Sequence, residues 1–270
     1  MNPVEVAQGD SPVILAFPHT GTHVPEDIWE RLNAEGRKLR DTDWHADRLY
    51  AGLLPAATTV RATFHRYCID ANRDPSGRTL YPGQNTTALI PQTDFDNRPI
   101  WEDEGGIGET ESVTRLSAFH GPYHAALAAE IERVKALHGV VILYDCHSIR
   151  SHCPFLFEGR LPDLNIGTDN GLTCAPEIEE AAREICSAAD GYSMVVNGRF
   201  RGGWTTRFYG VPKENVHAIQ MELVQSAYLA SESEPFAYDA GRAERLRPHL
   251  RALLERLEQI AFSMKKDQDR

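Results

Sequence analysis

Two histidines in this 270-residue sequence directly follow apolar runs, at positions where an imidazole could bind a metal ion. His19 comes after the run 12–17 and just before Gly21, and His147 comes after the run 139–144. A neutral imidazole is a strong zinc ligand, and a turn at the end of a buried strand leaves one side of the ring open to a substrate. Each histidine alone could simply cap a strand, but the repeated pattern favours one shared metal site.

A catalytic zinc site needs a third protein ligand as well as an open position. The candidates are acidic residues and histidines that follow the first run, namely His23, Asp41, Asp43 and His45. Asp41 and Asp43 could instead cap the start of a helix, and spacing alone does not choose among the four. Asp145 is expected to support His147 as a hydrogen-bond partner, or else to bond amides of its own turn.

Glu222 is a carboxylate inside an otherwise apolar segment, residues 218–224. Burying a carboxylate is costly unless it is paired or bound, so its position asks for a reason. A general base that activates a metal-bound water would supply one. The alternative is an edge strand on which Gln220 and Glu222 share a solvent-facing side. His217 is expected to be structural.

Arginines cluster in segments that follow predicted strands. Asn72-Arg73 combines a guanidinium, which binds carboxylates in a two-pronged fork, with an amide that adds direction. The glycine-rich loop 197–203 adds Arg199 and Arg201, and Arg207 follows shortly after. In a chain of net charge -11 this grouping predicts a pocket for an acidic substrate, with solvated surface arginines as the alternative.

Other chemistries find little support in the sequence. It lacks the glycine patterns of nucleotide-binding loops and the GxSxG motif of serine hydrolases. Cys146 beside His147 could be a thiol nucleophile, but adjacent side chains on a strand point to opposite sides. Lys and Arg number 28 against 39 Asp and Glu, which argues against a nucleic-acid partner.

Composition narrows the setting. Hydrophobic residues make up 41% and charged residues 25%, as in globular proteins. Five cysteines without CxxC spacing form no disulfide framework, so a cytoplasmic location is expected. Because no signal-like start and no run of 18 apolar residues occurs, no membrane association is expected. The oligomeric state stays open.

The elements that must position these residues alternate along the chain. Strands are predicted at 12–17, 58–69, 139–144, 192–196 and 216–224, and helices in two pieces within 26–54 and at 112–138, 175–189 and 238–262. The segments 74–111, 154–174 and 197–210 are predicted to be loops, the first long enough to be functional. This alternation predicts a single α/β domain over residues 1–270, with a mostly parallel sheet and ligands at the carboxyl ends of its strands.

Nine segments between Pro18 and about Tyr228 resemble, in order, those of the N-formylglutamate amidohydrolases. They are PHTGT, DTDWHADRLY, NR, PYH, DCHSIRS, LPDLNIGTDNG, NGRFRGG, TTRFYG and HAIQMEL. That family is similar to zinc carboxypeptidases and aspartoacylases, which implies a three-layer α/β/α fold around a mixed sheet. The relatives place a Glu three residues after the first metal histidine, where this chain has Thr22. The resemblance therefore moves the expected carboxylate ligand to Asp43, beside His19 and His147.

The resemblance implies hydrolysis of N-formyl-L-glutamate to L-glutamate and formate, the last step of a histidine degradation route. Zn²⁺, or another divalent transition metal, would activate the water, and Glu222 would be the catalytic base. Asn72 and Arg73, with Arg201 or Arg207, would bind the two carboxylates of this small dicarboxylate substrate. The alternatives are a deacylase for another N-acyl amino acid and a non-catalytic protein that binds carboxylates or metal.

Overall fold

A mixed sheet runs through the molecule. The computed structural model describes residues 2–103 and 106–268, with side chains up to residue 265. The described strands are β1 (Val4–Ala7), β2 (Val13–Phe17), β3 (Thr58–Ala62), β4 (Val141–Ile149), β5 (Leu164–Gly167), β6 (Met194–Val196) and β7 (Val216–Val224). Their order across the sheet is β1-β3-β2-β4-β7-β5-β6. The central strands β3, β2, β4 and β7 are parallel, whereas β1 pairs with β3 and β5 pairs with β7 in antiparallel fashion. The predicted mostly parallel, mixed sheet is confirmed.

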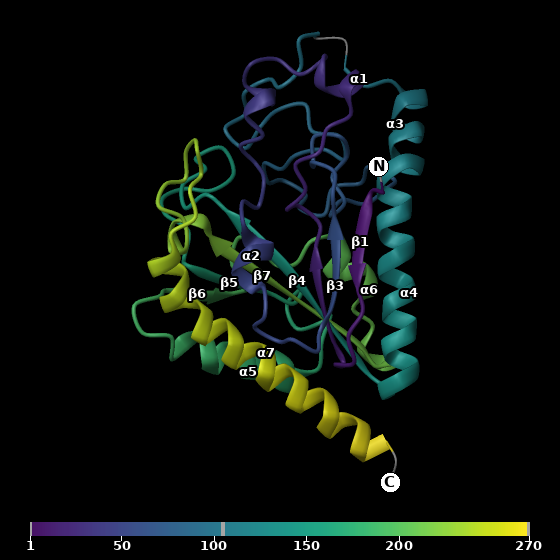
Figure 1. The fold of residues 1–270 in the computed structure, drawn as a ribbon, viewed down its shortest axis with the longest axis vertical. Coiled ribbons are helices and arrows are strands. Elements are labelled where there is room, and N and C mark those ends of the chain that lie inside the picture. The colour runs from purple at the N-terminus through teal and green to yellow at the C-terminus, as the bar shows by residue number, and fades with distance from the viewer. Residues whose placement is uncertain (1, 104–105, 269–270) are drawn as a thin grey trace.

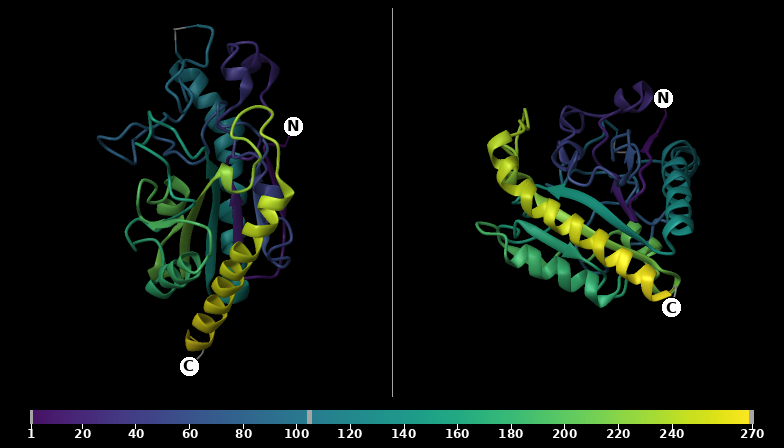
Figure 2. Two further views of the ribbon diagram at one scale, coloured as in Figure 1. Left: turned by 90° about the vertical axis from the view of Figure 1, so that its left-hand side faces the viewer. Right: turned by 60° about the horizontal axis from the view of Figure 1, so that its bottom comes forward.

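Helices cover both faces of the sheet (Figures 1 and 2). They are α1 (Glu26–Trp29), α2 (Ala46–Tyr50), α3 (Glu109–Arg115), α4 (Gly121–His138), α5 (Pro176–Ser187), α6 (Trp204–Tyr209) and α7 (Ala240–Gln268), and a π-helical turn at Leu116–His120 joins α3 to α4. Short 3₁₀ turns occupy Gly36–Lys38, Pro212–Glu214 and Gln225–Ala227. Helix α4 packs on β1 to β4 from one side, and α7, packed against α5, covers the other side. The three-layer α/β/α architecture follows.

The alternation of side chains along β4 explains why its first four residues, 141–144, are all apolar. Ile142 and Tyr144 point into the core layer under α5 and α7, while Val141 and Leu143 point into the layer under α4. A central parallel strand is covered on both faces, so neither set of side chains can be polar until the strand leaves the layers. Strand β7 is covered in the same way, and its nine residues are all buried.

Strand β4 is longer than predicted. The sequence suggests that the strand ends at residue 144 in a polar turn, but β4 continues to Ile149 and carries Asp145 and His147 inside it. Its register with β7 pairs Asp145 with Gln220 and His147 with Glu222. The ladder satisfies the backbone of these residues, and their side chains share the α4 side of the sheet, so polarity does not end the strand.

Several other boundaries also differ from the predictions. Strand β3 ends at Ala62 rather than at residue 69, and the predicted loops 154–174 and 197–210 contain β5 and α6. Strand β1 was not predicted. The helices expected within 26–54 shrink to α1, α2 and a 3₁₀ turn, because α2 begins only at Ala46, after His45 in a left-handed conformation. Neither Asp41 nor Asp43 therefore caps a helix, so that alternative is wrong. None of the described helices combines the length and apolar character needed to cross a bilayer.

Candidate metal centre and active site

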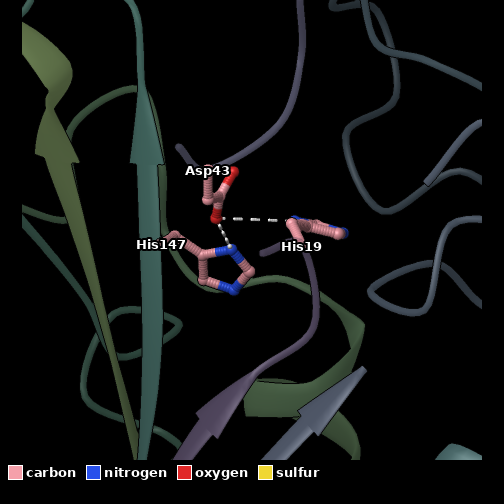
Figure 3. A group of neighbouring side chains, drawn as sticks. All are labelled: His19, Asp43 and His147. Carbon is pink, nitrogen blue, oxygen red and sulfur yellow. Dashed lines mark ion pairs between the residues drawn. The ribbon is translucent and has the colours of Figure 1, made fainter. Parts of the chain in front are cut away.

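Three buried side chains from three separate elements meet at the carboxyl end of the central strands. His19 follows β2, Asp43 lies in the turn before α2, and His147 is part of β4. Asp43 Oδ2 lies 3.3 Å from His147 Nδ1 and 3.9 Å from His19 Nδ1 (Figure 3). One ligand atom from each residue falls within 4.8 Å of the others. Two imidazole nitrogens and a carboxylate oxygen at this spacing match the donor set of a catalytic zinc site.

The far nitrogen of each histidine faces a second carboxylate. His19 Nε2 lies 2.7 Å from Asp70 Oδ1, and His147 Nε2 lies 3.1 Å from Asp145 Oδ2. When each Nε2–H donates to its carboxylate, both Nδ1 lone pairs are left free on the side of Asp43. This arrangement fixes the tautomer that a metal ligand requires.

The charges around the cluster favour a cation. Burial lowers the pKa of His19, which keeps its imidazole neutral. Burial would also lower the pKa of His147, but Asp145 and Asp43 together raise it well above its usual range. Asp145 Oδ1 is buried without a hydrogen-bond partner in the described residues. The carboxylates thus favour a positive charge on His147 when no metal is bound, and a divalent ion in the cluster would supply that charge in place of the proton, so the donor set fits such an ion.

Asp43 is the third member of the cluster, and the other three candidates lie elsewhere. Asp41 Oδ2 accepts hydrogen bonds of 2.9 Å from the Tyr67 hydroxyl and from the Phe95 amide. His23 extends the backbone ladder beside Phe64, and the His45 ring contacts Trp44 and Tyr238. The geometry thus singles out Asp43 where spacing left four residues open.

Glu222 lies in the same cavity as the three candidate ligands. Its strand, β7, has β4 on one side and β5 on the other, so the alternative of a solvent-facing edge strand is wrong. Its Oε2 accepts a 3.2 Å hydrogen bond from Gln220 Nε2, and Gln220 Oε1 in turn accepts one from the Gly203 amide. Burial raises the pKa of Glu222 to about 8, an effect that His147 opposes and Asp43 reinforces. A carboxyl group with this pKa can exchange protons near neutral pH.

The cavity also receives the guanidinium of Arg73. The Nη2 atom of Arg73 donates hydrogen bonds to the hydroxyls of Thr86 and Thr87, and its Nε donates one to the Thr87 carbonyl. The donor–acceptor distance is 3.0 Å in each case. No carboxylate of the described residues lies within 4.0 Å of this guanidinium. Arg73 therefore presents a positive charge to the cavity that only neutral oxygens solvate.

Comparison with known proteins identifies the family of this chain. The profile of the family described as N-formylglutamate amidohydrolase matches residues 11–229. This chain belongs to that family. It is 44% identical over 252 residues to the N-formylglutamate deformylase of Pseudomonas aeruginosa, covering 93% of this chain and 94% of that protein. The N-formylglutamate deformylase of Pseudomonas putida is 41% identical over 251 residues, 93% of either chain.

A solved member of the N-formylglutamate amidohydrolase family has the same fold. The crystal structure of the protein from Ralstonia eutropha JMP134 superposes with a TM-score of 0.80 and 25% sequence identity, covering 97% of this chain and 98% of that one. The helices and strands described above are therefore those of an amidohydrolase family, and the cavity at the carboxyl ends of β4 and β7 lies where an α/β sheet binds its ligands.

The other arginines predicted for this amidohydrolase site divide into two groups. Arg201 is exposed, and Arg207 forms an ion pair with Asp169 at 3.2 Å, so neither lines the cavity. Arg199, from the same loop, does line it. The expectation that Arg201 or Arg207 binds a substrate carboxylate thus finds no support in their positions, because neither side chain lines the cavity.

Asn72 lies beside His147, one of the three candidate metal ligands, and its side chain does not point freely into the cavity. Its Oδ1 accepts a 2.8 Å hydrogen bond from the Thr205 amide, and its Nδ2 lies 3.0 Å from His147 Nε2. The amide oxygen is thus occupied by the protein, whereas Nδ2 faces a ring nitrogen whose proton goes to Asp145, so this second contact is not a hydrogen bond in that tautomer. Direct contact with a substrate stays a prediction for Asn72. His217 accepts a hydrogen bond from the Ala175 amide, which is the structural role expected of it.

Two functional contacts of the N-formylglutamate amidohydrolase site were missed from sequence. Asp70 holds His19 through Oδ1 and Arg66 through Oδ2, and Arg66 with His19 overcomes the effect of burial to hold the pKa of Asp70 well below its usual range. His124 lies 2.7 Å from the carbonyl of Ala71. The place of Asp70 after a predicted strand, shortly before Asn72-Arg73, was a signal that could have identified it.

Proposed function

We propose that this protein hydrolyses N-formyl-L-glutamate to L-glutamate and formate, with Zn²⁺ bound by His19, Asp43 and His147 and with Glu222 as catalytic base. The observation that carries the proposal is one buried cavity that holds the three candidate ligands, Glu222 and an unpaired guanidinium. The names of the two Pseudomonas relatives and of the Ralstonia protein support the choice of substrate. The reaction would end a route of histidine degradation.

Arg73 is proposed to bind one substrate carboxylate. A carboxylate that enters the cavity would gain a charge-assisted hydrogen bond from a guanidinium that now has only hydroxyl and carbonyl partners. The guanidinium of Arg73 acts electrostatically on Asp70, which binds His19, and this supports a carboxylate held on the side of the cavity next to the metal ligands. The formyl group of a substrate bound in this way would lie near the cluster.

Glu222 is proposed to move the proton that hydrolysis requires. A divalent ion in the cluster would polarise the formyl carbonyl and lower the pKa of a water molecule from near 16 to about 7. Glu222 takes a proton from this water while the water oxygen forms a bond to the formyl carbon. When the bond between that carbon and nitrogen breaks, Glu222 returns the proton to the leaving amine, and formate and L-glutamate result.

The proposal is tested by measuring formate release from N-formyl-L-glutamate by the purified, zinc-loaded protein. We expect turnover that a chelator abolishes and that added Zn²⁺ restores. Acetate release from N-acetyl-L-glutamate should be slower, because the cavity must accept an extra methyl group beside the cluster. Absence of formate release by zinc-loaded protein would contradict the proposed reaction, and faster acetate release would assign the protein to another acyl group.

The metal ligands are tested separately by bound zinc. His19→Ala, Asp43→Ala and His147→Ala should each reduce zinc, measured by mass spectrometry, well below one ion per chain. His45→Ala is the matched control, because this histidine lies near Asp43 in sequence but its ring packs on Trp44 and Tyr238. Full zinc retention by Asp43→Ala would remove Asp43 from the ligand set.

A further inference from the structure

The proposed substrate carries two carboxylates, and Arg73 accounts for only one of them. Three arginines line the cavity, namely Arg66, Arg73 and Arg199. Arg66 is already neutralised, because its Nη2 binds Asp70 Oδ2 at 2.5 Å. The second substrate carboxylate therefore needs Arg199 or no cation of the cavity lining at all. This inference rests on the proposed function and adds the residue that binds the second substrate carboxylate.

Arg199 has the features of a preformed carboxylate site. Its Nε donates to the Leu156 carbonyl over 2.8 Å, and its Nη2 donates to the Asn85 carbonyl over 2.6 Å. Nη1 has no hydrogen-bond partner among the described residues, and no carboxylate of theirs lies within 4.0 Å of the guanidinium. Backbone carbonyls hold the group in place without cancelling its charge, which leaves a donor for an incoming anion.

Aromatic rings support the same guanidinium. The Arg199 Cζ atom lies 5.6 Å from the centroid of the Tyr81 ring and 5.2 Å from that of Phe200. The Tyr81 hydroxyl donates a 2.7 Å hydrogen bond to the Gly202 carbonyl, which fixes the ring beside the loop that carries Arg199. A guanidinium restrained in this way loses little conformational entropy when a carboxylate binds.

The places of the two arginines assign the two substrate charges. The guanidinium of Arg73 acts electrostatically on Asp70, the carboxylate that binds His19, and so it lies on the metal side of the cavity. Arg199 is fixed to Asn85, in the loop between β3 and α3, and to Leu156, in the loop between β4 and β5; we call these the covering loops. In the substrate the α-carboxylate is attached to the carbon that bears the formylated nitrogen, and the γ-carboxylate is two bonds further from that nitrogen. We propose that Arg199 binds the γ-carboxylate and thereby selects glutamate.

The test compares Arg199→Gln with wild type on N-formyl-L-glutamate and on N-formyl-L-glutamine, which lacks only the γ charge. We expect kcat/KM for N-formyl-L-glutamate to fall by about 10- to 100-fold, since a charge-assisted hydrogen bond to a half-buried guanidinium is lost. N-formyl-L-glutamine should change less than about threefold, because it never made that charge-assisted bond. Arg201→Gln is the matched control, because it removes the same charge two residues away and outside the cavity, and it should change neither substrate.

Arg73→Gln gives the reciprocal test with N-formyl-L-isoglutamine, in which the α-carboxylate is an amide. The Arg73→Gln variant should lose much of its kcat/KM on N-formyl-L-glutamate and little on this analogue. If Arg199→Gln lowers both the glutamate and glutamine substrates equally, Arg199 only holds the loops together and the inference is overturned. If Arg199→Gln leaves N-formyl-L-glutamate turnover intact, the inference is overturned as well.

Two further measurements separate this inference from folding and from the proposed function. Should Arg199→Gln prove unfolded by circular dichroism, Arg199→Lys decides instead, because it keeps the charge but shortens its reach and should lower only the glutamate rate. Should wild type not hydrolyse N-formyl-L-glutamate, the proposed function fails on its own. Calorimetric binding of L-glutamate and of L-glutamine then tests Arg199, and equal loss of both in the Arg199 variant would overturn its role.

Discussion

The cavity has two walls that are built in different ways. One wall consists of β4 and β7, which carry His147 and Glu222 on paired positions of a buried ladder. The other consists of the loops around Tyr81 and Arg199, which long side chains fasten to backbone carbonyls. The groups proposed for bond breaking thus belong to the rigid wall, and those proposed for recognition belong to the adaptable one. Substitutions in the first wall should affect kcat, and substitutions in the second should affect KM and selectivity.

The largest effect is expected from Glu222→Gln in the strand wall. The amide keeps the shape of the side chain and its contact with Gln220 but cannot accept a proton. We expect kcat to fall by about 10²- to 10⁴-fold, the range of general acid–base catalysis, with bound zinc unchanged. A variant as active as wild type would show that Glu222 is not the base, and it would favour a purely binding role for the cavity.

Asp145→Asn should weaken zinc binding by about 10- to 100-fold, because it removes the charge that orients His147 from behind. Competition with a fluorescent chelator measures this affinity. Asp47→Asn, a partly exposed position in α2, serves as the control and should keep the wild-type affinity. Unchanged affinity in Asp145→Asn would mean that the strand alone orients His147.

His124 supports the segment that carries Asn72 and Arg73, because its Nε2 contacts the carbonyl of Ala71 just before them. Burial, assisted by the neighbouring His120, lowers the pKa of His124 to about 3, and the Ala71 carbonyl only partly opposes this. The unfolded chain, with a histidine pKa near 6.5, therefore binds a proton that the folded protein refuses between about pH 6.5 and 3. The stability that neutral His124 provides is complete above pH 6.5 and is lost as the pH falls through this window.

Urea unfolding between pH 5 and 7.5 measures that loss. For wild type, His124 should reduce the free energy of unfolding by up to about 1.4 kcal/mol per pH unit of acidification below its unfolded pKa. His124→Gln should be less stable at pH 7.5 and should show a flatter pH dependence. His152→Gln, at an exposed histidine, should keep the wild-type slope. If the free energy of unfolding depended on pH equally in wild type and His124→Gln, folding would not lower the pKa of His124.

The smallest effect is expected from Tyr81→Phe in the loop wall. The change removes the hydrogen bond to Gly202 but keeps the ring beside Arg199. One such bond is worth about 0.5 to 1.5 kcal/mol, so KM should rise about two- to tenfold while kcat stays within about twofold. A fall in kcat with unchanged KM would contradict the separation of the two walls.

The sequence predicts the strand wall better than the loop wall. Apolar runs before His19 and around Glu222 identify buried strands, and parallel strands bring their carboxyl ends together, so the convergence of these residues could be foreseen. The continuation of β4 through His147 could not, because it depends on the pairing with β7, which no local pattern encodes.

The loop wall depends on contacts between residues that are distant in sequence. Arg199 binds the carbonyl of Asn85, 114 positions earlier in the chain. Such a bond decides which of three neighbouring arginines turns inward, and spacing within the loop carries no trace of it. The choice of Asp43 over Asp41 is of the same kind, because Tyr67 and Phe95 bind Asp41 from elsewhere in the chain.

The pairing of His147 with Glu222 across β4 and β7 has an evolutionary consequence. A shift of one residue between these strands would turn the glutamate toward the apolar layer under α5 and α7, so the register tolerates no gradual change. The covering loops face no such restriction, and lengthening them leaves the ladder intact. Descendants of this chain could therefore acquire new acids as substrates by altering loops while inheriting the reacting pair unchanged.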